Sequence, residues 1–389
     1  MKLTAVFAKS LREQYRDPLT LALTLVFAPV FVLLYWLFFP SGGSTTYTVL
    51  VINQDIGIEK DGMTHLAGLE ATEALLAITY ANGYPMLKVR RVASQAEAES
   101  LLRDRKAAVF INLPADFSQS LAAAQSGDYS VASRVVIGGD LTNPYYPIAM
   151  ILATSAIESY VQQVTGQSRP LQYAEEPLGG SGARTEFETY VPGLFIFAIV
   201  MLVFIASMTV AREVEAGTLH RIKITKVNSI ELLGGIGLSL VIIGLIAEIL
   251  ALVTALALGF QSYGPLWIAL LIGGVTSVAV IGVGMIVAAF SKTVAQAFII
   301  ANFPLALFMF FTGAVFPIPP VTIFDVAGRS ISLYDFLPPT HAVVALNKVL
   351  TLGAGLEEVS YELAMLLVLS VAYFVFGSWL FRRRHMVSS

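Results

Sequence analysis

The side chains that could do chemistry are few and widely spaced. The chain of 389 residues has four histidines and no cysteine, so disulfides, thiolate chemistry and cysteine metal sites are excluded. The histidines are scattered, and His65 is interpreted as a surface residue because a metal site needs several converging donors. The dipeptide Gly-Lys occurs nowhere, so no GxxxxGK[ST] phosphate-binding loop is present. The chain is therefore not expected to be an enzyme, and any work it does must draw on an ion gradient or a separate subunit.

One carboxylate lies in the middle of a long apolar run. Glu248 would cost at least about 2.5 kcal/mol to insert at bilayer depth, so it should face protein or water. Two interpretations stay open: a functional group, or a structural carboxyl that is protonated or hydrogen-bonded. In a later run, Asn302 and Pro304 mark either a pathway or hinge or only helix packing. Other side chains could line an apolar path or simply pack or face lipid: Phe204, Ser207, Met208, Phe308, Met309, Phe311 and Thr312.

The elements that position these residues are predicted to be membrane-spanning helices. Hydrophobic residues make up 56% of the chain and charged residues 13%, against about 25% charged in a soluble domain. Mean hydropathy is +0.74 and the net charge is -3, which gives no reason to expect nucleic-acid binding. Six runs are long enough to cross a bilayer: about 19–39, 191–211, 232–259, 266–290, 294–316 and 361–381.

The basic residues beside these runs predict their orientation. They gather in the N-terminal arm, after the second run, at Lys292 and in the C-terminal triplet Arg382–Arg384. All of these segments lie on one side if six runs span, so both termini are predicted to be cytoplasmic. The first run is longer than a signal-peptide core and lacks a small-residue cleavage site, so it is expected to be retained as a span.

The N-terminal arm, residues 1–18, has a helical pattern. Leu3, Phe7, Leu11 and Tyr15 recur every four residues, whereas the basic residues fall largely elsewhere: Lys2, Lys9, Arg12 and Arg16. This pattern predicts an amphipathic helix on the cytoplasmic membrane surface. The alternative is a basic leader that only sets the topology.

A polar stretch separates the first span, 19–39, from the rest. Residues 40–190 are predicted to form a small extracytoplasmic α/β domain, because strand patterns at Tyr47–Asn53, 87–92 and 107–113 alternate with helical ones. Ser94 is predicted to cap a helix, with Glu97 completing a capping box. The domain contains no Ser/His/Asp set, paired-carboxylate signature or HExxH motif. The fold class is therefore a polytopic α-helical membrane protein with an α/β domain between its first two spans.

The remaining part, 191–389, is predicted to be a five-span domain with two special segments. The link 212–231 is densely charged and could form a short helix along the membrane that transmits a push from a cytoplasmic partner, or it could be a solvated loop. The segment 317–352 is interrupted by prolines and Asp335. A re-entrant or surface helix, from about Ile331 to Leu352, fits it better than a seventh span.

Several short motifs resemble the permease subunits of type-2 ABC exporters, also called type V ABC transporters. Glu215-Ala-Gly217-Thr218-Leu219 resembles that family's Glu-x-Gly-Thr-Leu element after the second span. Phe311-Thr-Gly313-Ala-Val-Phe-Pro317 resembles its Gly-x-x-x-Pro stretch, and Leu337-Pro-Pro-Thr-His341 resembles the segment before its last span. The order of one span, an external domain and five spans matches the larger drug- and lipid-exporting members. Thr225 is followed by Lys226 where the family often has Thr-Pro.

The resemblance implies partners and roles. Two permease copies, as a homodimer or a heterodimer with a paralogue, would join two ATP-binding subunits in a bacterial inner membrane. ATP and Mg would be bound by those subunits, and this chain would hold no cofactor or metal of its own. Membrane lipids and a periplasmic adaptor are further expected partners. Residues implied to couple to the ATPase are Arg212, Glu213, Glu215, Gly217, Thr218, Arg221, Lys223 and Lys226, with Phe7, Leu11, Arg12, Tyr15 and Arg16 on the interfacial helix.

The resemblance also implies a translocation path along the permease dimer interface, formed largely by spans one, two and five. The expected cargo is a hydrophobic or amphipathic molecule such as a drug or lipid. Two other functions remain open. One is a proton-coupled secondary transporter that uses Glu248, although no inverted repeat is visible. The other is a membrane sensor or scaffold that transports nothing.

Overall fold

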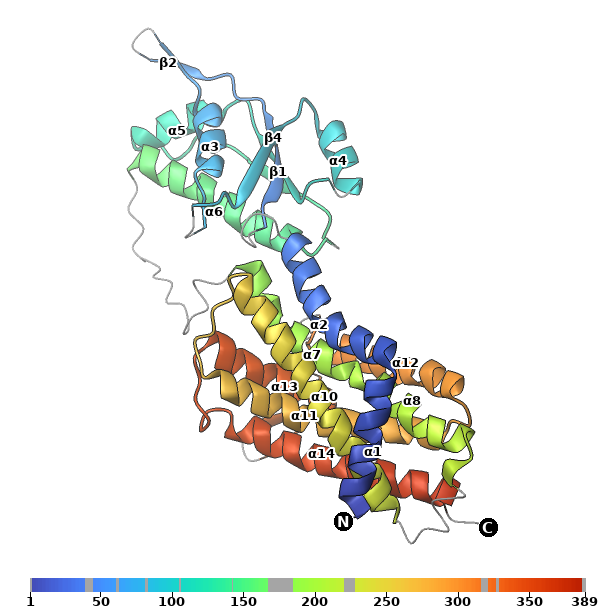
Figure 1. Cartoon of the computed structure of the whole chain (residues 1–389). Helices are drawn as coiled ribbons and strands as arrows, with labels where there is room; N and C mark the ends of the chain where they lie inside the picture. The colour runs from blue at the N-terminus through green and yellow to red at the C-terminus, as the bar shows by residue number, and fades with distance from the viewer. Residues whose placement is uncertain are drawn as a thin grey trace. The chain divides into compact units, whose positions relative to one another are not determined.

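The computed structural model of the chain describes residues 2–38, 45–60, 63–80, 83–104, 106–141, 143–166, 185–219, 228–315, 321–326 and 329–386. The chain forms two compact units, each with its own hydrophobic core (Figure 1). One unit is continuous, Ser44–Glu176, and the other combines Met1–Gly43 with Pro177–Ser389.

The Ser44–Glu176 unit is built on a four-stranded sheet with the order β4-β1-β5-β6. The central strand β1 pairs in parallel with β4 and β5, whereas β6 runs antiparallel to β5. The strands are β1 (Tyr47–Asn53), β4 (Leu87–Arg91), β5 (Val109–Leu113) and β6 (Val136–Gly138). A separate hairpin, β2 (Ile58–Lys60) and β3 (Met63–His65), was not predicted, because strands of three residues are too short for an alternating pattern.

Helices cover both faces of this sheet. Alternate residues of β1 serve opposite faces: Val49 and Val51 pack with α3, α5 and α6, whereas Leu50 and Ile52 pack with α4. A central parallel strand therefore reads as an unbroken apolar run. The helices are α3 (Ala67–Leu76), α4 (Gln95–Arg103), α5 (Phe117–Gln125) and α6 (Tyr146–Thr165). The predicted cap at Ser94 accepts the Glu97 N–H at 3.3 Å, but the Glu97 carboxylate accepts from the Ala93 N–H instead of completing a capping box.

A single carboxylate ties the end of β1 to the starts of two helices. Asp55 accepts hydrogen bonds from the N–H groups of Gly57, Gly68 and Ser118, at 2.8–3.3 Å, and from the Ser118 hydroxyl at 2.6 Å. Partial burial alone would raise the pKa of Asp55, but the hydrogen bonds from Ser118 and the backbone outweigh it and hold the pKa below its ordinary value.

The second unit contains six helical stretches, among the described residues, that are long and apolar enough to cross a membrane. They are α2 (Pro18–Phe38), α7 (Glu186–Val200) continued by α8 (Leu202–Glu215), α10 (Ser229–Ala257), α11 (Leu266–Ala289), α12 (Val294–Phe311) and α14 (Ser360–Phe381). The second stretch starts five residues before the predicted Val191, because Thr185 and Glu188 form a reciprocal capping box that begins the helix there.

The segment predicted as a helix from about Ile331 begins differently. Strands β7 (Thr322–Val326) and β8 (Arg329–Ser332) pair antiparallel, and a 3-10 turn, η2 (Leu333–Phe336), follows. The helix proper, α13 (Pro338–Leu346), starts at the two prolines, which are favoured in a first helical turn, and continues as a π-turn, η3 (Asn347–Thr351). Positions 317–320 and 327–328 of the predicted segment lie outside the described residues.

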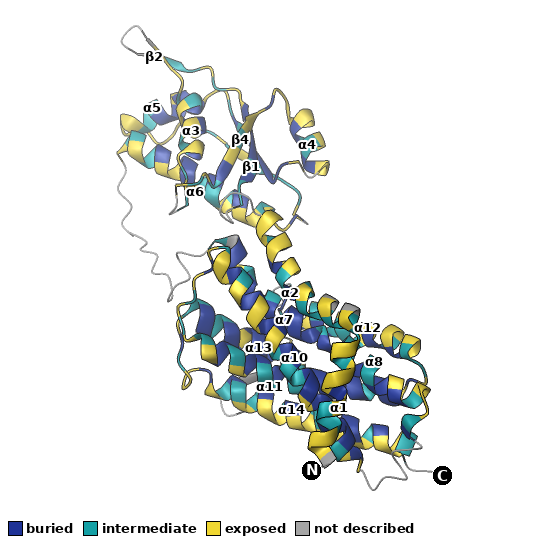
Figure 2. Cartoon of the chain, in the orientation of Figure 1, coloured by how far each residue is buried: buried dark blue, intermediate teal, exposed yellow. Residues whose placement is uncertain are grey.

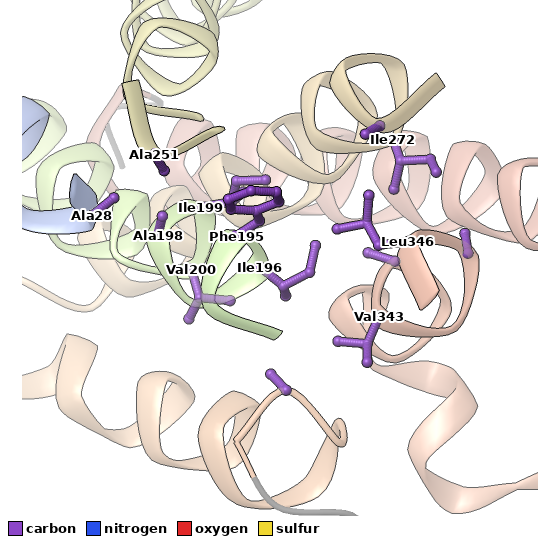
Figure 3. Close-up of a cluster of buried hydrophobic side chains, with 14 of the residues drawn as sticks. Ala28, Phe195, Ile196, Ala198, Ile199, Val200, Ala251, Ile272, Val343 and Leu346 are labelled. Carbon is purple, nitrogen blue, oxygen red and sulfur yellow. The ribbon is translucent and has the colours of Figure 1, made fainter. Parts of the chain in front are cut away.

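The core of this unit lies between α7, α11 and α13. Figure 3 shows Phe195, Ile196 and Ile199 of α7 on one side of this cluster, with Ile272 of α11 and with Leu346 and Val343 of α13 on the other side. Coverage of the other helices is uneven (Figure 2): only 12% of the apolar window of α2 and 17% of that of α12 are buried, against 67% for α11. Apolar faces of α2 and α12 are therefore left without a partner inside the described part of the chain.

Candidate functional site

The N-terminal helix α1 (Lys2–Arg16) packs against the first part of α10 (Figure 1) and is hydrogen-bonded to α8 through its side chains. Its inward face carries small and polar groups: the Ser10 hydroxyl lies 2.7 Å from that of Ser239, and the Gln14 amide donates to Thr209 at 3.1 Å. The helices approach closely at Gly235, where an added Cβ would lie 2.8 Å from the side chain of Val6. The contact therefore requires glycine.

The predicted apolar stripe of α1 lies on a different face. Leu3 and Leu11 are 36% and 37% exposed and Tyr15 is 78% exposed, while Phe7 is half-buried. Arg12 and Arg16 are also exposed. The helix thus packs on the bundle with one face and leaves an amphipathic surface free, which is the distribution that an interfacial helix needs.

Charged side chains join α1 to α8. The Lys9 ammonium lies 2.7 Å from the Glu213 carboxylate, which is 10% exposed and also accepts a short hydrogen bond from the Thr218 hydroxyl. Partial burial would lower the pKa of Lys9, but the hydrogen bond and charge of Glu213 raise it above its ordinary value. A weaker pair joins Arg212 to Asp17 at 3.5 Å. The end of α8 is therefore fixed to the N-terminal helix.

The end of α8 is also tied to the start of α12. The Glu215 carboxylate accepts the N–H of Val294, the first residue of α12, at 2.7 Å. A negative charge at a helix N-terminus is favourable because unpaired N–H groups and the helix dipole are positive there. Gly217 follows with a φ of +65°, a left-handed conformation that ends α8 and that glycine adopts without strain.

These contacts define what we call the coupling cluster: Lys9, Arg212, Glu213, Glu215, Gly217 and Thr218. It joins the N-terminal helix, the second span and the fifth span at one end of the bundle. The sequence singled out the α8 residues but did not indicate their partners, because Lys9 and Glu213 are 204 residues apart. The other predicted coupling residues, Arg221, Lys223 and Lys226, lie outside the described residues.

The predicted pathway residues fall into separate groups. Ser207, Phe308 and Thr312 are buried inside the chain at 0%, 3% and 4% exposure. Phe204 and Met208 on α8 are half-buried, and the Phe204 ring lies 5.1 Å from that of Phe298 on α12. On α12, Asn302 is exposed and its amide donates to the carbonyl of Phe298 at 2.8 Å, while Phe311 is 39% exposed. The exposed members lie on the uncovered surface of α12.

Glu248 is isolated from the other candidates. It is 1% exposed, and neither carboxylate oxygen has a hydrogen-bond partner among the described residues. The group sits directly on Gly273 of α11, where an added Cβ would lie only about 2.0 Å from it. An ionised carboxylate in such a place would be very unfavourable, so the geometry fits a neutral carboxyl group.

Fold and site together define a class of protein: a polytopic α-helical membrane protein that carries a charged cluster at one end of its bundle. A comparison with protein families matches the chain over residues 18–379 to the family described as ABC-2 family transporter protein. The chain therefore belongs to this family and is the membrane component of a transporter. A comparison with curated proteins gave no match.

Proposed function

We propose that this chain is the permease subunit of an ATP-driven exporter that moves a hydrophobic or amphipathic molecule out of the cytoplasm or the inner leaflet. Membership of the ABC-2 family implies an ATP-binding partner, and the chain has no phosphate-binding loop of its own. The observation that carries the proposal is the coupling cluster, in which the last turn of the second span, at the end of α8, holds both α1 and the start of α12.

The coupling cluster is the docking place for the ATP-binding subunit in this proposal. The basic residues around it favour a cytoplasmic position, so both termini are cytoplasmic and the Ser44–Glu176 unit is extracytoplasmic. ATP and Mg are bound by the partner. A push on α8 would reach α12 through the Glu215–Val294 hydrogen bond and α1 through the Lys9–Glu213 ion pair.

A second permease copy covers the free faces of α2 and α12. Large apolar side chains are left uncovered there, among them Phe303 at 72% and Ile299 at 68% exposure on α12. Lipid could cover them as well, but Asn302 lies between them, and a polar amide in a lipid-facing surface is unfavourable. The translocation path then runs along this interface, beside Phe204, Asn302 and Phe311.

The test is ATP hydrolysis by purified components in proteoliposomes. The chain alone should hydrolyse no ATP, and addition of its ATP-binding partner subunit should give hydrolysis that depends on both proteins. ATP hydrolysis by the chain alone, or hydrolysis by the ATP-binding subunit that does not depend on the chain, would contradict the proposal. A proton-coupled mechanism through Glu248 has less support, because that carboxyl is sealed between α10 and α11 in this conformation.

A further inference from the structure

A furrow runs along the outside of the bundle between α10 and α14. Two adjoining cavities of about 250 and 180 Å³ form it, and both are lined by Phe374. The first is bounded by the start of α10 and the end of α14, at Ser229 and Arg382. The second continues along α10 to Val241. Neither α2 nor α12 contributes a lining residue, so the proposed permease dimer would leave the furrow open to lipid.

The floor of the furrow is apolar, and two glycines make the furrow deep there. Gly234 and Gly237 carry no side chains, and the walls are Leu238 and Val241 of α10 with Val278 and Ile281 of α11. Twelve residues separate Ser229 from Val241, which at 1.5 Å per residue gives a length of about 18 Å. That is close to the thickness of one leaflet, because the hydrocarbon core of a bilayer is about 30 Å thick. The furrow therefore has the length and chemistry of an acyl chain.

The open end of the furrow is cationic. Arg382 lines it, and within the described residues its guanidinium has no hydrogen bond or ion pair. Its two neighbours are engaged: Arg383 lies 5.5 Å from the Trp379 ring and Arg384 lies 4.1 Å from that of Phe290. The first turn of α10 is not expected to bind the anion in place of Arg382. Asn228 and Glu231 form a capping box there, which already engages its N–H groups.

We propose that this furrow binds an anionic phospholipid of the cytoplasmic leaflet, with one acyl chain over Gly234 and Gly237 and the phosphate at Arg382. Charge complementarity and length favour this occupant: basic pockets between spans at the cytoplasmic side suit anionic headgroups, and tryptophan belongs at the headgroup level. Trp379 lines the same end. The inference rests on the cytoplasmic position of the C-terminus in the proposed function, but not on ATP hydrolysis.

Tryptophan fluorescence can test the proposal at the site itself. The chain has three tryptophans, so Trp36→Phe with Trp267→Phe leaves Trp379 as the reporter. The full chain is reconstituted in phosphatidylcholine vesicles that contain increasing amounts of brominated phosphatidylglycerol or brominated phosphatidylcholine. Bromine on the acyl chain quenches a tryptophan that it contacts. Brominated phosphatidylglycerol should quench Trp379 at about fivefold lower mole fraction, the order expected for one arginine at an anionic headgroup.

Two variants and two controls decide the outcome. Arg382→Gln should abolish the preference for the anionic lipid, and Gly234→Val, whose added Cβ meets only Leu3 at 3.5 Å, should reduce quenching by both lipids. Arg384→Gln removes the same charge outside the furrow and should keep the preference. A chain in which Trp267 is the only tryptophan should be quenched equally by both lipids. Equal quenching of Trp379 by both lipids, or equal losses in Arg382→Gln and Arg384→Gln, would overturn the proposal.

Discussion

The hydrogen bond from the Val294 N–H to the Glu215 carboxylate is expected to couple the movement of α8 to that of α12. It is the described contact that ties the end of α8 directly to the first residue of α12, at 2.7 Å. Glu215 is exposed, so the value of about 1.5–3 kcal/mol for a hydrogen bond to a charged group must be reduced. A charge at a helix N-terminus is worth about 0.3–1 kcal/mol. We therefore assign about 1 kcal/mol to the contribution of this hydrogen bond.

A contact of that size should shift a conformational equilibrium measurably. If the bond holds α8 and α12 together in one state only, its loss changes the ratio of joined to separated states by about fivefold, since 1.4 kcal/mol corresponds to tenfold. Glu215→Ala should produce the full shift. Glu215→Gln should produce a smaller one, because the amide oxygen still accepts a hydrogen bond but carries no charge.

Spin labels can measure this ratio without a known cargo. The chain has no cysteine, so Ala216→Cys and Ala295→Cys introduce two labels on exposed alanines beside the bond. The label-to-label distance distribution is recorded for the complex with the ATP-binding subunit. Asp335→Ala is the matched control, because this carboxylate also accepts a backbone N–H at 2.7 Å but within a single segment. An unchanged distribution in Glu215→Ala, or an equal change in the control, would show that this hydrogen bond does not hold α8 and α12 together.

Three further predictions concern stability and charge. Lys9→Met should lower the free energy of unfolding, measured by thermal denaturation, by about 1–2 kcal/mol, which lies between the values for exposed and buried ion pairs. Adding Glu213→Gln should restore most of this loss, because the unpaired buried charge is then removed. Additive losses in the double variant would contradict this. Asp55→Ala should speed hydrogen exchange of the first-turn amides of α3 and α5, whereas Asp128→Ala, which removes a carboxylate bonded to Ser130 two residues away, should not. Because hydrogen bonds from Ser118 and the backbone hold the pKa of Asp55 below its ordinary value, its stabilisation is present above that ordinary value and is lost as the pH falls through the folded-state pKa, so protection that persists below the folded pKa would be inconsistent. Glu248→Gln should change stability by less than about 1 kcal/mol and leave ATP hydrolysis of the complex intact; a stable but inactive variant would assign the carboxyl an ionisable role.

Local patterns were enough to predict most of the fold. The six apolar runs, the main strands of the α/β unit and the N-terminal helix follow from hydropathy and period, because each signal lies within one segment. The early start at Glu186 and the hairpin β2–β3 were missed, since a capping box overrode the apolar boundary and three-residue strands leave no pattern.

The candidate site was only half predictable. The Glu-x-Gly-Thr-Leu element indicated Glu215 and Gly217, but not that Glu215 reaches Val294 or that Glu213 reaches Lys9. Contacts between residues about 80 to 200 positions apart depend on helix packing, which no short motif encodes. The furrow beside Arg382 could not be predicted from the sequence either. Two glycines three positions apart indicate only close helix packing, and the furrow is recognised once α14 lies next to them.

The energy source of transport separates an ATP-driven permease from a proton-coupled transporter. Inverted vesicles that contain the chain and the ATP-binding subunit are incubated with a panel of hydrophobic fluorescent dyes in the outer medium, and accumulation inside is followed with ATP or with a proton gradient alone. We expect accumulation that requires ATP and the subunit and persists when a protonophore collapses the gradient. Accumulation that proceeds without ATP and the subunit, and stops with the protonophore, would contradict it.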